Sequence, residues 1–227
     1  MFFGEIVYVV VTPLAILGVV VLAILALSGR SEPDPRGERA YVLYLSLVSF
    51  IALFTLLFAA VDLASTAAQA LVDPDSGACV DPFSPECLGR PDDFGIDSGG
   101  ELRTRDLLNS GAIAVVAGAI LLFHQGKTRR LLDEDGFAGS AGARTLTAYL
   151  YAVSFTAMAI LLVGAAIVVP AAIRAIAPGL TALESSDAER DAALLDLLPA
   201  LVAAAGGVVV YLTHWRAAGR LRRGGHG

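Results

Sequence analysis

The chain has 227 residues, of which 56% are apolar and 17% charged, and its formal net charge is −6. Soluble domains contain about 45–50% apolar and about 25% charged residues. The apolar excess here lies in blocks of about twenty residues, the length of a membrane-spanning helix. This pattern excludes a soluble enzyme and a disordered chain, and the acidic balance leaves no basic surface for nucleic acid.

The first uncharged block, Ile6–Leu27, predicts a membrane-spanning helix with Pro13 inside it. A signal peptide is the alternative interpretation. No basic residue precedes the block, however, and the block exceeds the usual apolar region of about 7–15 residues. We therefore expect this helix to be retained.

Four further apolar blocks follow in the chain, and each predicts a membrane-spanning helix. They are Tyr41–Val61, which Leu63–Val72 extends, Leu107–Phe123, Leu146–Val169 and Leu197–Thr213. The predicted fold is therefore all-α, with five transmembrane helices in a bundle.

Basic residues predict the orientation, because cytoplasmic loops carry an excess of Lys and Arg. Segments 28–40, 125–146 and 215–227 carry 11 of the 16 basic residues, and segments 72–106 and 170–192 carry the other five. Five spans place the first three segments on one side of the membrane. We expect a multi-pass cell-membrane protein with its N-terminus outside and its C-terminus in the cytoplasm.

Both cysteines, Cys79 and Cys87, fall in the predicted outer loop 73–106. Disulfides persist in oxidising compartments, and the segment between the two cysteines holds two prolines and no regular pattern. A Cys79–Cys87 disulfide is the prediction, and two free thiols are the alternative. The length of this loop makes it a candidate contact site outside the membrane.

The chain also contains an internal repeat. Tyr44, Ser49 and Phe50 match Tyr149, Ser154 and Phe155, 105 residues later, and further matches 90 residues apart include Asp106 with Asp196 and His124 with His214. The predicted organisation is an N-terminal helix with its following loop (1–38), a first hairpin (39–131) and a second hairpin with a basic tail (144–223). Both hairpins have the same orientation, so a pseudo-two-fold axis along the membrane normal is expected.

The repeated Tyr-x4-Ser-Phe unit, with a returning helix that ends in His214-Trp215, resembles an uncharacterised family of bacterial membrane proteins. That family is defined only as a domain of unknown function, and the resemblance covers roughly 39–223. Gln125 stands where the first copy would carry the tryptophan. The resemblance implies membrane residence and no activity. The use of fifteen Arg and one Lys is typical of bacteria with GC-rich genomes.

His124 and His214 lie at equivalent repeat positions near the cytoplasmic ends of their helices. If the two side chains converged on the repeat axis, neutral imidazoles would suit a haem iron or another metal. Haem b is thus the one cofactor considered, and no metal site is otherwise predicted. The alternative is that both rings lie at the headgroup level, where amphipathic rings are enriched.

Acidic residues mark the outer ends of the predicted spans. Asp62 is a candidate buried charge at the outer boundary of the second span, where an ion or proton role competes with pairing to Arg103 or Arg105. Asp106 and Asp196 directly precede the third and fifth predicted spans. Helix capping explains their positions without catalysis.

Small residues predict where helices pack closely, since they let backbones approach in lipid. Ala114 and Gly118 form such a face in the third span, and Gly206 and Gly207 form one in the fifth. We expect these two faces to form the seam between the repeats. Phe50, Phe54 and Phe58 form a bulky stripe on the second span, expected to face lipid, with a partner or ligand surface as the alternative.

No motif of an enzyme is present: the chain has no phosphate-binding glycine loop, metalloprotease His-Glu pair or nucleophile elbow. The predicted function is therefore non-catalytic, that of a structural or accessory subunit that binds other membrane proteins or lipids. A homo-oligomer is one form this could take. A small transporter or channel built on the repeat, and a bis-histidine redox protein, are the alternatives.

Overall fold

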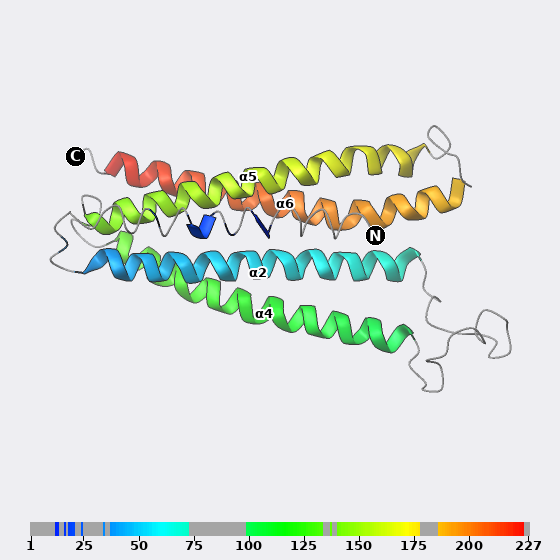
Figure 1. The fold of residues 1–227 in the computed structure, drawn as a ribbon, viewed down its shortest axis with the longest axis horizontal. Coiled ribbons are helices and arrows are strands. Elements are labelled where there is room, and N and C mark those ends of the chain that lie inside the picture. The colour runs from blue at the N-terminus through cyan, green and yellow to red at the C-terminus, as the bar shows by residue number, and fades with distance from the viewer. Residues whose placement is uncertain are drawn as a thin grey trace.

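The computed structural model describes residues 12, 13, 16, 18–20, 24, 34, 37–72, 99–133, 137, 140–177 and 186–224. Four long helices dominate the described chain: α2 (Glu38–Val72), α4 (Gly99–Leu132), α5 (Ala141–Ile176) and α6 (Ser186–Gly224). They run up and down side by side in one elongated bundle (Figure 1). The all-α prediction is confirmed.

All four helices are long and apolar enough to cross a membrane. They contain 35, 34, 36 and 39 residues, which at ~1.5 Å per residue is about 50–60 Å of helix. A bilayer core is only about 30 Å thick. The helices must therefore project well beyond the hydrocarbon region.

The prediction of five spans is overstated, because four candidate spans are found in the described chain. Most of Ile6–Leu27 lies outside the described residues. Those that are described, from Thr12 to Ile24, are helical. Gly18 is buried, and a Cβ added to it would lie 2.6 Å from Phe50 Cζ. Part of this segment therefore packs on α2.

Two helices begin at the same end of the bundle, and each is capped by an oxygen-bearing side chain. The Asp34 carboxylate accepts hydrogen bonds from the backbone N–H groups of Glu38 and Arg39 at 3.1 and 3.0 Å. The Ser140 hydroxyl accepts one from the Ala143 N–H at 3.1 Å. Such caps satisfy donors that a helix start leaves unpaired.

The expected caps Asp106 and Asp196 are wrong, because both helices begin earlier than predicted. α4 begins at Gly99 and α6 at Ser186, so both aspartates lie inside a helix. Asp196 instead accepts a hydrogen bond from Arg174 of α5 at 3.0 Å. This ion pair ties the projecting ends of α5 and α6 together. Pro199 also lies inside α6.

α2 is the central helix of the bundle, since it packs against α4, α5 and α6, and α5 packs most extensively against α6. α4 contacts only α2 among the described helices. A two-fold axis would exchange α2 with α5 and α4 with α6, so the contact of α2 with α6 would require a contact of α5 with α4. That contact is absent from the described helices, and the expected two-fold arrangement is wrong.

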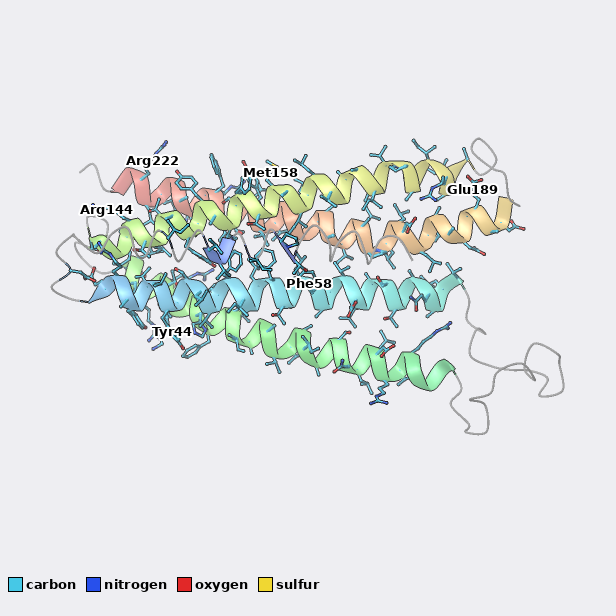
Figure 2. All side chains as sticks on the ribbon, viewed as in Figure 1. Tyr44, Phe58, Arg144, Met158, Glu189 and Arg222 are labelled. Carbon is cyan, nitrogen blue, oxygen red and sulfur yellow. The ribbon has the colours of Figure 1, made fainter. Side chains whose placement is uncertain are left out.

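The phenylalanine stripe on α2 faces the core rather than lipid. Phe50 is 1% exposed and Phe54 is 7% exposed. Their ring centroids lie 4.5 Å apart, and Phe58 is half-buried. In Figure 2, Phe58 extends from α2 toward the α5–α6 side of the bundle. The expectation of a lipid-facing stripe is wrong because hairpin packing turns this face inward.

The tight seam of the bundle joins α5 to α6. A Cβ added at Gly207 would lie 3.0 Å from Ala157 O and from Leu161 N, both backbone atoms of α5. A Cβ added at Gly164 would lie 3.1 Å from the backbone N of Ala204 on α6. Small residues here let two backbones approach each other, as lipid-embedded helices require.

The predicted seam between the third and fifth spans is wrong, because α4 and α6 do not touch within the described chain. A Cβ at Gly118 would meet nothing within 4 Å. Ala114 is half-buried, on the side of α4 that carries the buried Ala117 and Leu121. Gly206 does pack closely, but its neighbour is Leu57 of α2, whose Cδ1 would lie 2.8 Å from an added Cβ.

Candidate functional site

Each hairpin brings one tyrosine against one histidine. Tyr44 of α2 and His124 of α4 have ring centroids 5.9 Å apart. Tyr149 of α5 and His214 of α6 have ring centroids 6.1 Å apart. These four residues occupy matching positions in the predicted repeat, so the two hairpins present the same aromatic pair at the same place.

The two histidines are held in the same way. Nδ1 of His124 lies 2.8 Å from the carbonyl oxygen of Ile120. Nδ1 of His214 lies 2.8 Å from that of Val210. A carbonyl only accepts hydrogen bonds, so Nδ1 carries the proton and donates in both rings. Each ring is thereby fixed against its own helix one turn back, and both are buried.

The structure does not bring the two histidines together. His124 lies on α4 and His214 on α6, and these helices make no contact in the described chain. Each ring instead packs against the tyrosine of its own hairpin. The described residues also contain no group of three or more His, Cys, Asp or Glu side chains placed to hold a metal ion.

The tyrosines differ in their surroundings. Tyr149 is 5% exposed, and its hydroxyl forms a hydrogen bond with the Ser49 side chain of α2. Tyr44 is 56% exposed and lies on the outer face of α2 (Figure 2). The second hairpin is therefore covered by α2, whereas the matching face of the first hairpin is open.

Tyr149→Phe should destabilise the protein by about 1 kcal/mol, the scale of an interhelical hydrogen bond in a bilayer. The substitution keeps the ring but removes the hydroxyl that Ser49 bonds. Tyr44→Phe is the matched control and should leave stability unchanged. Thermal unfolding in detergent checks both. Equal effects of the two substitutions would contradict the difference in packing described here.

The open face of the first hairpin contains a groove of about 400 Å³ between α2 and α4. Its lining is almost wholly apolar, with a single threonine among the lining residues. This α2–α4 groove is lined by Val48, Ile51, Ala52 and Thr55 of α2 and by Ala112, Ile113, Val116, Ala117 and Ile120 of α4. Its volume falls within the range of about 300–1,000 Å³ for binding pockets.

Asp62 is exposed on α2 rather than buried. Its backbone carbonyl accepts a hydrogen bond from the Thr66 hydroxyl at 3.0 Å. No ion pair of Asp62 with Arg103 or Arg105 is found in the described chain. The hypothesis of a buried charge is therefore not supported by the position of Asp62.

Cys79, Cys87 and most of loop 73–106 lie outside the described residues.

Most of the basic residues of the described helices lie toward one end of the bundle. α2 and α5 begin there, and α4 and α6 end there (Figure 1). Its basic side chains are Arg39, Lys127, Arg129, Arg130, Arg144, Arg216, Arg220 and Arg222. The opposite end carries Arg103, Arg105, Arg174 and Arg190, and the bundle is therefore electrically asymmetric along its length.

The sequence marks both histidines but neither their partners nor the groove. The tyrosines recur in the predicted repeat, and their equal placement near the basic end of each hairpin is the signal that could identify them as the partners. No sequence signal distinguishes the groove-lining residues from other apolar residues. Comparisons with protein families, curated proteins and solved structures find no match for this chain.

Proposed function

We propose that the protein is a non-catalytic, multi-pass membrane protein that acts as a structural or accessory subunit. It binds other membrane proteins or lipids through the apolar surfaces of its first hairpin. The α2–α4 groove carries this proposal, because it is apolar, open and placed within the membrane-spanning part of the helices. A bilayer offers such a groove only acyl chains or apolar helices.

The one-sided attachment of α4 supports the same function. Among the described helices α4 contacts α2 alone, and its outer side exposes Leu108 (69%), Val115 (73%) and Leu122 (71%). Lipid tails are as apolar as leucine, so exposure alone is ordinary in a membrane. A helix held on one side only is, however, well placed to be packed from another side by a partner.

We also propose the orientation with the basic end in the cytoplasm, following the excess of Lys and Arg at that end. Ile6–Leu27 as a fifth span would then place the N-terminus outside. Loop 73–106, with a Cys79–Cys87 disulfide, would lie outside as a second contact region. In a chain from which Cys79 and Cys87 have been removed, a single cysteine placed at Gly224 should be protected from impermeant thiol reagents added outside the cell.

Purification in a mild detergent or in polymer-bounded native bilayer tests the function. We expect a lipid or protein species to remain bound in a fixed ratio to the chain, measured by mass spectrometry. Ile51→Trp fills the groove and should release that species. Val115→Trp adds the same bulk outside the groove and should retain it. A chain that keeps nothing in fixed ratio would refute the proposal.

A further inference from the structure

The packing of α2 on the second hairpin defines an internal interface with two sides. α2 contributes one face, in which Phe50 is 1% exposed, in part because the N-terminal segment packs on it at Gly18, and Ala68 is 2% exposed. The second hairpin contributes the receiving side. Two contacts fix the register: Leu57 against Gly206 of α6, and Ser49 against Tyr149 of α5.

Most of the face of α5 that matches the inserted face of α2 is open, although Ser154, the match of Ser49, is buried. We define the α5 outer stripe as Tyr151, Phe155, Leu162, Val169 and Ile173, whose side chains are 37%, 66%, 63%, 59% and 50% exposed. In the repeat they match Ser46, Phe50, Leu57, Ala64 and Ala68 of α2. The inserting side is thus used once, by α2, and is present a second time on α5, where Tyr151 packs edge-on against Trp215 of α6 and the other four side chains are exposed.

The receiving side of the second hairpin also has a counterpart on the first hairpin, and only the one on the second hairpin is filled. On α5 it consists of Tyr149, Val153, Thr156 and Ile160, which are all buried. The matching residues of α2 are Tyr44, Val48, Ile51 and Thr55, which are exposed or half-buried. The last three line the α2–α4 groove. The groove is therefore the counterpart of the site that α2 fills in the second hairpin.

From this pair of open surfaces we infer that the protein associates with further copies of itself head to tail. The α5 outer stripe of one copy seats in the α2–α4 groove of the next. The inference rests on the proposed function in using the same groove, and it names the partner as a second copy of this chain.

Membrane geometry restricts how such an assembly can grow. The interface joins two different surfaces, so it is heterologous, and repeating it gives a ring or an open filament. All helices must stay upright in the bilayer with their basic ends on the same side. The operation that relates neighbouring copies is then a rotation about the membrane normal, which favours a closed ring.

The internal interface predicts a specific contact between copies. Leu57 lies against Gly206, and the repeat matches these residues to Leu162 and Val116. Leu162 of one copy should therefore lie against Val116 of the next. Because α4 and α5 make no contact within one described chain, a disulfide between these positions must join two copies.

Disulfide trapping tests the contact in native membranes. In a background of Cys79→Ser and Cys87→Ser, the pair Leu162→Cys and Val116→Cys should give covalent oligomers on mild oxidation. The matched control pairs Leu162→Cys with Val115→Cys. Val115 is the residue directly before Val116 on α4, is 73% exposed against 59% for Val116, and does not line the groove. Trapping should be at least tenfold weaker for the control.

Two outcomes would overturn the inference. One is the absence of covalent oligomers with Val116→Cys, and the other is equal trapping with both pairs, which would indicate random collision. Light scattering of the parent chain in mild detergent adds a second measurement. We expect a mass greater than that of one chain, and a strictly monomeric mass would contradict the inference. A monomer that retains a lipid or another protein in fixed ratio would refute this inference alone and leave the proposed function standing.

Discussion

Gly207→Leu should destabilise the bundle by about 3 kcal/mol, the upper part of the usual range for overpacking a close contact. A Cβ added at this position would already lie 3.0 Å from two backbone atoms of α5. Backbone atoms cannot move aside without displacing the helix. We expect α5 and α6 to separate, and the midpoint of thermal unfolding in detergent to fall accordingly.

Gly118→Leu is the matched control for this substitution. It adds the same side chain to a helix of similar length, at a position where a Cβ meets nothing within 4 Å. Leucine is a better helix former than glycine by about 0.8 kcal/mol, so this variant should be neutral or slightly stabilised. A loss of stability at Gly118 equal to that at Gly207 would contradict the location of the seam.

Phe50→Ala should destabilise the protein by about 3 kcal/mol, the lower end of the range for large-to-small core substitutions. The ring is 1% exposed, and its centroid lies 4.5 Å from that of Phe54, so its removal leaves a cavity at the centre of the bundle. The lower end applies because lipid, rather than water, solvates the side chain when the helices separate.

Phe123→Ala serves as the comparison, since Phe123 of α4 is 62% exposed. Its truncation removes an exposed ring whose contacts with His124 and Lys127 lie within its own helix, and it should change stability by less than about 1 kcal/mol. Chemical unfolding in mixed micelles, followed by the fluorescence of Trp215, measures both variants. If the stripe on α2 faced lipid, Phe50→Ala would match Phe123→Ala, and the packing described here would be wrong.

The two hairpins have different surroundings although they carry matching residues. Tyr44 and Tyr149 each pack against a histidine at about 6 Å, yet one tyrosine is exposed and the other buried. The same holds for Phe50 and Phe155, which are 1% and 66% exposed. The tyrosine–histidine contact therefore recurs at the positions that the predicted repeat matches, whereas the packing around the two hairpins differs.

The membrane class, the all-α fold, the last four spans and the separation of charge along the bundle could all be predicted from the amino-acid sequence. These features depend on the length of apolar runs and on where charges interrupt them, and both can be counted along the chain. The sequence also marked His124 and His214, because polar residues that recur in an apolar repeat stand out. The predicted starts of α4 and α6 were too late. Both helices begin in polar segments, and an apolar run cannot mark the start of such a helix.

The helix faces that pack together could not be predicted from the sequence. The sequence placed the phenylalanine stripe of α2 against lipid, and the seam on Ala114 and Gly118, and both assignments were wrong. In a soluble helix, an apolar stripe identifies the buried face because water covers the other faces. In a bilayer the lipid is as apolar as the neighbouring helix, so a helix such as α2 is apolar on all sides. Its buried face is then selected by close packing with its neighbours, which depends on the shapes of residues far away in the chain.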